Sequence, residues 1–169
     1  ALRLTGPIRR GHLQAAITEV VRRHEALRST FATEEGEAIQ HVHPPPSIAL
    51  NVTKVSRATL KSRMEVEGAR PFDLGGDLML RTRLFELTPD EHVLQFTMHH
   101  IASDAWSLDL LLHECLALYD NLARGQTPSL PEPPIQYTDF ALWQRDAMQD
   151  DRLQRHLDYW KHKLAGIPD

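Results

Sequence analysis

Two adjacent histidines, His99 and His100, precede an aspartate, Asp104, in the segment HHIASDAWS that covers residues 99–107. Histidine titrates near neutral pH, so either ring could accept or donate a proton. Residues 93–98 are rich in β-branched and aromatic side chains, whereas the leucines after residue 107 recur at helical spacing. The histidines are therefore expected between a strand and a helix, where scaffolds commonly present reactive groups.

The two rings should have different surroundings. Side chains of a strand alternate between its faces, which places His100 with Phe96 and Met98 and places His99 with Thr97. Opposed rings are poorly placed to bind one metal ion together, so we expect no metal site. One histidine can then act while the other packs, and structural roles for both are the competing interpretation.

Three segments resemble motifs of the condensation domains of nonribosomal peptide synthetases. Residues 99–107 resemble the family's HHxxxDG motif, with Ala105 in place of the glycine. Residues 23–31 read RHEALRSTF and resemble RHExLRTxF, and residues 137–145 read YTDFALWQR and resemble YxDFAxWQR. HHxxxD alone recurs among acyltransferases, but the three segments in this order identify the chain as a member of the family.

The resemblance implies a lobe with the chloramphenicol acetyltransferase-like fold. Residues 1–169 would be the N-terminal lobe of a condensation domain, with the beginning of that lobe and the whole C-terminal lobe absent. We interpret the proline-rich residues 127–134 as a loop within the lobe. Strands and helices mix without strict alternation, which predicts an α/β chain of the α+β type with a mixed sheet covered by helices. Strands are expected at 2–5, 29–31, 38–42, 48–55, 78–87 and 92–99, and helices at 9–24, 57–69, 107–123, 137–149 and 152–164.

Composition excludes several classes of partner. With 41% hydrophobic and 25% charged residues, the chain has the composition of a soluble globular protein. The net charge of −4 and the lack of a long basic run argue against nucleic acid. No apolar run approaches the roughly 20 residues of a membrane span. The one cysteine, Cys115, cannot form an internal disulfide, which suits a reducing cytoplasm.

The resemblance implies the formation of an amide (peptide) bond. The donor would be an aminoacyl or peptidyl thioester and the acceptor an aminoacyl thioester, each on the phosphopantetheine arm of a peptidyl carrier domain. This reaction needs an amine that loses a proton as it attacks, and stabilisation of an oxyanion. His100 is the expected catalytic residue, as proton acceptor or as the group that positions the amine. The domain itself is expected to hold no cofactor, and its partners would be two carrier domains and the C-terminal lobe.

Asp104 has two interpretations, and we expect it and His99 to support the site structurally. Aspartate is a favoured N-cap of helices. The family resemblance implies instead a salt bridge from Asp104 to an arginine of residues 23–31, with Arg28 as the first choice and Arg23 as the second.

Ala105, Trp106 and Ser107 are candidates for an oxyanion site or a substrate channel. The family usually has glycine at position 105, and its amide has been suggested to face the oxyanion. If that position requires positive φ, alanine is strained by about 1 kcal/mol; if φ is negative, the change is nearly silent. A tryptophan that begins a helix often packs in the core, so both a channel and a core position are open for Trp106.

Several alternatives share the fold or the sequence features. Within the fold, the chain could be an epimerisation domain or a free-standing acyltransferase; cyclising relatives carry an aspartate in place of the histidine pair, which argues against them. In a different class, it could be a degenerate, non-catalytic module that only recruits carrier domains, and Ala105 supports this. Because the family's site lies between two lobes, the lobe alone is expected to be inactive.

Overall fold

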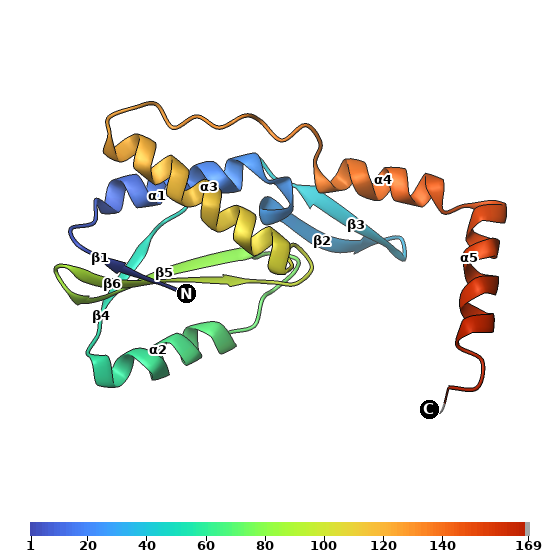
Figure 1. Ribbon diagram of the computed structural model, residues 1–169, viewed down its shortest axis with the longest axis horizontal. Helices are drawn as coiled ribbons and strands as arrows, with labels where there is room; N and C mark the ends of the chain where they lie inside the picture. The colour runs from blue at the N-terminus through green and yellow to red at the C-terminus, as the bar shows by residue number, and fades with distance from the viewer. Residues whose placement is uncertain (168–169) are drawn as a thin grey trace. The chain divides into compact units, whose positions relative to one another are not determined.

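The computed structural model describes residues 1–167, apart from the side chain of Asp150. It divides the chain into two compact units, Ala1–Pro133 and Pro134–Asp169. The division falls within the proline-rich residues 127–134. Figure 1 shows the elements of each unit.

A four-stranded mixed sheet forms the centre of the first unit (Figure 1), in the order β1-β6-β5-β4. The hairpin of β5 (Leu80–Thr88) and β6 (Glu91–Met98) is antiparallel, and β1 (Leu2–Thr5) adds to β6 in the same sense. β4 (Asn51–Lys54) pairs with β5 in parallel. The expected mixed sheet is confirmed, although β4 is shorter than the strand predicted over 48–55.

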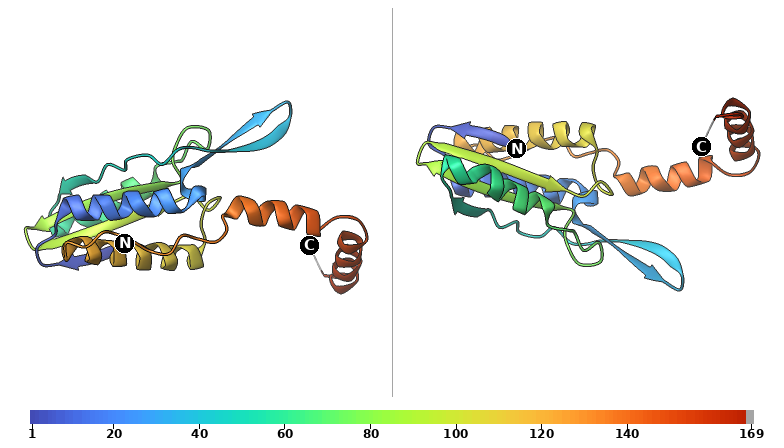
Figure 2. Two further views of the ribbon diagram at one scale, coloured as in Figure 1. Left: turned by 90° about the horizontal axis from the view of Figure 1, so that it is seen from above. Right: turned by 90° about the horizontal axis from the view of Figure 1, so that it is seen from below.

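Helices cover both faces of this sheet (Figures 1 and 2). α1 (Arg10–Arg23) and α3 (Ala105–Ala123) lie on one face, and α2 (Arg57–Ala69) lies on the other. α1 and α3 pack their apolar stripes against the sheet and each other. None of the described helices is long and apolar enough to cross a membrane. The core on the α1 side includes Leu13, Ile17, Val20, Leu84, Leu94, Leu111, Cys115 and Leu118.

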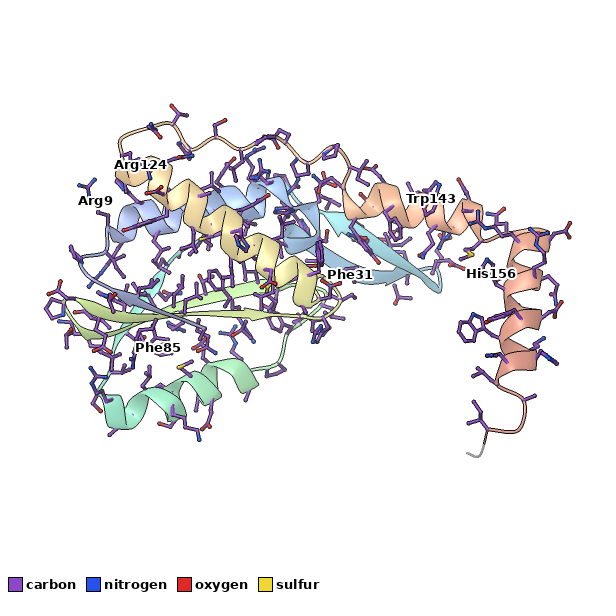
Figure 3. The ribbon with its side chains drawn as sticks, viewed as in Figure 1. Arg9, Phe31, Phe85, Arg124, Trp143 and His156 are labelled. Carbon is purple, nitrogen blue, oxygen red and sulfur yellow. The ribbon has the colours of Figure 1, made fainter. Side chains whose placement is uncertain are left out.

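The face toward α2 mixes apolar and polar contacts. Phe85 projects from β5 on this side and is 2% exposed (Figure 3). Arg83, two residues earlier on the strand, forms an ion pair with Glu67 of α2 at 2.9 Å. Gln95 of β6 donates from Nε2 to the carbonyl of Met64 at 3.1 Å. Strand alternation therefore directs the odd-numbered residues of β5 and β6 toward α2.

A short 3-10 helix, η1 (Glu25–Arg28), leads from α1 into a separate hairpin. Its strands are β2 (Ser29–Glu34) and β3 (Glu37–Val42), and the hairpin extends beyond the central sheet (Figure 2). Glu35 and Gly36 at its tip have φ of 50° and 86°. Two successive residues with positive φ give the turn that matches the twist of a hairpin.

The second unit contains α4 (Tyr137–Ala147) and α5 (Asp150–Lys163). Asp139 in the first turn of α4 accepts a hydrogen bond from the amide of Gln136 at 2.8 Å, which closes the helix start. On α5, apolar side chains recur at helical spacing but are exposed: Leu153, Leu157, Trp160 and Leu164.

A buried ion pair joins α1 to α3. The side chain of Arg23 is 3% exposed, and its Nε and Nη2 donate to the two carboxylate oxygens of Glu114 at 3.0 and 3.1 Å. Its Nη1 and Nη2 also donate to the carbonyls of Leu130 and Pro131, and Nε2 of His24 lies 2.8 Å from Glu114 Oε2. Burial acts to raise the pKa of Glu114, but the hydrogen bonds from Arg23 and His24 outweigh it and hold that pKa below its ordinary value.

The substitution Glu114→Gln should lower the free energy of unfolding by about 3 kcal/mol at pH 7, because it removes the bidentate carboxylate from the buried guanidinium of Arg23 and leaves Glu132, at 3.9 Å from Nη1, as a weaker ion-pair partner. A carboxyl with a lowered folded-state pKa stabilises the protein above its ordinary pKa. The difference between the two proteins should therefore shrink as the pH falls through the lowered pKa of Glu114. Urea denaturation followed by circular dichroism measures both effects.

The matched control is Glu65→Gln on α2. Glu65 forms an exposed i,i+4 pair with Lys61, in which the two side chains are 65% and 89% exposed. Such pairs contribute less than about 1 kcal/mol. Equal losses of stability in the two variants would contradict the role assigned to Glu114.

Candidate active site

The site is a tight turn between β6 and α3. The sheet ladder continues one residue past β6, since the amide of His99 donates to the carbonyl of Met79 at 3.2 Å. The carbonyl of His99 then accepts the amide of Ala102 at 3.0 Å and the hydroxyl of Ser103 at 3.1 Å. His100 lies in this turn. Its ring is therefore placed by the turn, and the expectation from strand alternation does not extend to it.

The ring of His99 is held on two sides. It meets the ring of Phe72 in a T-shaped contact, with centroids 5.8 Å apart and an interplanar angle of 77°. Its Nδ1 accepts a hydrogen bond from the amide of Ile101 at 3.0 Å. An acceptor Nδ1 places the proton of the neutral ring on Nε2. His99 is half-buried, and these contacts favour the structural role predicted for it.

His100 presents a free nitrogen at the surface. Its side chain is exposed, and Nδ1 lies 3.0 Å from the carbonyl oxygen of Ser103. A carbonyl can only accept, so Nδ1 carries the proton of the neutral ring and Nε2 carries the lone pair. Nε2 makes no hydrogen bond within the described part of the chain. The turn thus fixes one tautomer of His100, with Nε2 ready to accept a proton or a hydrogen bond.

Asp104 is the N-cap of α3. Its Oδ1 accepts hydrogen bonds from the amide of Ser107 at 2.8 Å and from the hydroxyl of Ser107 at 2.6 Å. The hydroxyl bond contributes most, with the amide bond next, to holding the pKa of Asp104 below its ordinary value. Ser107, a candidate for the oxyanion site or channel, is therefore committed to capping the helix.

The expected salt bridge from Asp104 to Arg28 is wrong in this structure. Arg28 donates instead to the Glu25 carboxylate at 3.3 Å and to the carbonyl of His43. Arg23, the second choice, is engaged by Glu114. The physical reason is local: an N-cap side chain reaches the amide three residues ahead without the ordering of a distant partner.

Ala105 and Trp106 begin α3. The only non-glycine residue with positive φ in the described chain is Glu35, so Ala105 has a negative φ and its methyl group imposes no backbone strain. Ala105 is exposed, and its amide lies in the first turn, where amides lack acceptors within the helix. Trp106 is 84% exposed, which excludes a core position for it in this structure.

Three residues that hold the turn or α3 are not among the predicted site residues: Ser103, Phe72 and Glu114. Ser103 acts through its carbonyl, which every residue possesses, and no pattern distinguishes it. Phe72 lies in a PFDL segment that is far from His99 in the sequence. Glu114 is a single charge beside the buried Leu111 and Cys115 of α3, and such a charge calls for a buried partner. Among the side chains that the structure describes, no group of three or more His, Cys, Asp or Glu could hold a metal ion.

The sequence profile of the condensation domain family matches residues 1–169. A linear gramicidin synthase of Brevibacillus parabrevis is 39% identical over 171 residues, which cover 97% of this chain and 3% of that protein. The nonribosomal peptide synthetase TES of Alternaria alternata is 41% identical over 172 residues, covering 98% of this chain and 3% of that one. The chain belongs to the condensation domain family and spans a few per cent of the length of these relatives.

Solved structures of the family share the fold. The X-domain from teicoplanin biosynthesis superposes with a TM-score of 0.91 at 34% identity, covering 98% of this chain and 38% of that one. The starter condensation domain of the rhizomide synthetase RzmA has a TM-score of 0.86 at 17% identity, covering 99% of this chain and 42% of that one. At that identity, the second likeness concerns the fold alone.

The substitution Ser107→Ala should raise the pKa of Asp104 toward its ordinary value, because it removes the hydroxyl bond that lowers this pKa most. The carboxyl carbon chemical shift of Asp104 followed against pH measures the change. The stabilisation by Asp104 is present above its ordinary pKa and is lost as the pH falls through the lowered folded-state value. In Ser107→Ala that loss should move to higher pH.

Ser62→Ala is the control for this measurement. Ser62 also lies in a helix, and its hydroxyl donates to the carbonyl of Thr59 at 3.0 Å rather than to a carboxylate. The substitution Ser62→Ala should leave the pKa of Asp104 unchanged. An unchanged pKa in Ser107→Ala would show that the Ser107 hydroxyl does not lower it.

Proposed function

We propose that the chain is part of a nonribosomal peptide synthetase condensation domain that forms an amide bond, with His100 as its catalytic residue. The observation that carries the proposal is the hydrogen bond from His100 Nδ1 to the Ser103 carbonyl at 3.0 Å on an exposed ring. This bond keeps the proton of the neutral ring on Nδ1, so that Nε2 is the acceptor. Membership of the condensation domain family supports acyl transfer as the class of reaction.

His100 Nε2 serves the amine of the acceptor. The amine nitrogen attacks the thioester carbonyl of the donor, a C–N bond forms, and the carbonyl oxygen becomes an oxyanion. The tetrahedral intermediate then collapses, the C–S bond breaks, and the sulfur leaves as a thiolate. Nε2 accepts a hydrogen bond from the amine, orients it, and can take the proton that the nitrogen loses and return it to the thiolate. Both roles use this one hydrogen bond between Nε2 and the amine. A general base takes the proton, whereas a positioning group only orients the amine.

The start of α3 supplies the group that stabilises the oxyanion. The first-turn amide of Ala105 is available to an external acceptor, and the N-terminus of a helix favours negative charge. The ordinary backbone at Ala105 supports this role, because the methyl group does not displace the amide. Trp106 is exposed next to this amide in the sequence and can line the path of a substrate.

The substrates would be thioesters on phosphopantetheine arms of peptidyl carrier domains, and the second wall of the site would come from a C-terminal lobe. The names of the relatives, linear gramicidin synthase and nonribosomal peptide synthetase TES, support this assignment. The exposure of His100 and Trp106 also fits a surface that another lobe covers. The phosphopantetheine group enters as substrate and needs no resident cofactor in this chain.

His100→Gln in a full condensation domain should reduce the rate of amide formation by roughly 10²- to 10⁴-fold, because glutamine cannot accept the amine proton. The measurement uses two loaded carrier domains and quantifies the amide product by mass spectrometry. His99→Gln is the matched control on the adjacent residue and should lose much less. A rate unchanged by His100→Gln would contradict catalysis by His100.

A docking module is the second candidate, and one finding favours it. The X-domain from teicoplanin biosynthesis, similar to this chain at 33% identity and a TM-score of 0.90, has been solved in a complex with OxyB. That complex shows that this fold can bind a partner protein. Unchanged product formation in His100→Gln, together with loss of product when the lobe is deleted, would favour docking over catalysis.

The 169-residue chain alone should form no amide product with both loaded carriers, because a catalytic site between two lobes needs both walls to hold the donor and the acceptor together. The same assay with the full domain is the positive control. Product formed by the isolated chain at a comparable rate would show that this lobe contains the whole site.

A further inference from the structure

Phe72 lies between a cation and an imidazole. The Cζ atom of Arg81 is 3.9 Å from the centroid of the Phe72 ring, and the ring of His99 meets Phe72 edge-on. A guanidinium over a ring face and a T-shaped pair of rings are both favourable contacts. Phe72 therefore links β5 to the first residue of the turn that carries His100.

Arg81 is held in place over Phe72 by the backbone of the same segment. Its Nη1 donates to the carbonyl of Pro71 at 3.0 Å, and its Nη2 donates to the carbonyl of Arg70. Burial, followed by the charge of Arg70, lowers the pKa of Arg81, while Asp77 and Glu67 act in the opposite direction. A partly desolvated guanidinium interacts more strongly with an aromatic face.

The segment that carries Phe72 is braced by its own hydrogen bonds. Asp73 Oδ1 accepts the amide of Gly75 at 3.0 Å, and the carbonyl of Asp73 accepts the amide of Asp77 at 2.8 Å. The amide of Asp73 donates back to Asp77 Oδ2 at 3.1 Å. The carbonyl of Leu74 accepts the amide of Phe31 at 2.8 Å, which ties the segment to β2. These hydrogen bonds restrict the conformation of the segment that carries Phe72.

His99 connects Phe72 to the turn that carries His100. Its carbonyl holds the hydroxyl of Ser103, and its Nδ1 holds the amide of Ile101. Ser103 in turn offers its carbonyl to Nδ1 of His100. A change in the position of the His99 ring therefore disturbs its bond to the amide of Ile101, which lies within the turn that orients His100.

We propose that Phe72, clamped by Arg81, is a positioning residue for the reaction: it fixes His99 and thereby the turn that sets the His100 tautomer. The inference rests on the proposed function of His100 for its catalytic consequence. Its structural part is independent of that function, because the tautomer of His100 can be measured in the chain without any substrate.

Nitrogen-15 NMR of the histidine rings tests the structural part. In the unaltered chain, His100 should show a protonated Nδ1 and an unprotonated Nε2 at a pH where the ring is neutral. Phe72→Leu keeps an apolar side chain but removes the ring, so the His99 ring shifts should move and His100 should become a mixture of tautomers. Phe72→Tyr keeps the ring and should restore the pattern. An unchanged His100 tautomer in Phe72→Leu overturns the proposal.

Arg81→Met tests the clamp, with Arg83→Met as its matched control. Arg83 lies two residues away on β5, faces the same side, and pairs with Glu67 rather than with Phe72. Arg81→Met should shift the His99 ring signals, and Arg83→Met should not. Equal shifts from both substitutions would indicate a general loosening of this face and would overturn the specific role of Arg81.

Turnover in a full condensation domain tests the consequence for the reaction. Phe72→Leu should lower kcat roughly three- to tenfold, the size that a T-shaped aromatic contact supports, with KM nearly unchanged. Phe72→Tyr should recover most of the loss. A disturbed tautomer with full kcat overturns the positioning role. If His100→Gln itself leaves kcat unchanged, the proposed function fails, and the NMR result still decides whether Phe72 sets the tautomer.

Discussion

A buried charge must be compensated where it lies, and in this fold the compensation of Arg23 determines how the helices are placed. The guanidinium is almost fully enclosed and has a bidentate carboxylate partner in Glu114, supplemented by two backbone carbonyls. An unpaired charge at this position would be costly, so α1 and α3 have little freedom to slide past each other. The arginine-histidine segment of residues 23–31 therefore contacts the middle of α3, at Glu114, rather than Asp104.

The placement of α3 matters because the turn that carries His100 is anchored at both ends. At one end, β6 is an inner strand with neighbours on both sides. At the other end, Asp104 closes the first turn of α3. The turn between these anchors makes most of its orienting contacts with backbone atoms, including the carbonyl that holds His100. A turn held by backbone hydrogen bonds is stiff, and the proposed role of His100 as a proton acceptor requires such a preorganised ring.

Much of the fold follows from periodicity in the sequence. The alternation of residues 78–99 predicts the central hairpin, and the spacing of Leu111, Cys115 and Leu118 predicts a helix with one buried face. The boundaries shift by a few residues where a cap decides them. α3, for example, begins at Ala105 rather than at residue 107, because Asp104 caps it.

The site was only partly predictable, for physical reasons. The motif indicates that His100 and Asp104 belong together, but it does not say which donor the carboxylate takes. A local bond to Ser107 has little entropy to overcome, and it formed in place of the ion pair expected with Arg28. The contact of Phe72 with His99 depends on how a distant loop folds back, which periodicity does not encode. Pattern therefore indicates the candidate residue, and only the fold shows what holds it.

The exposure of the tryptophans has a consequence for how this chain can be observed. Trp106, Trp143 and Trp160 are the only tryptophans in the sequence, and they are 84%, 60% and 54% exposed. Indole rings already in water change their emission little when the core melts. Intrinsic fluorescence is therefore a poor probe of melting for this protein, but it is a sensitive reporter of any molecule that covers α3, α4 or α5.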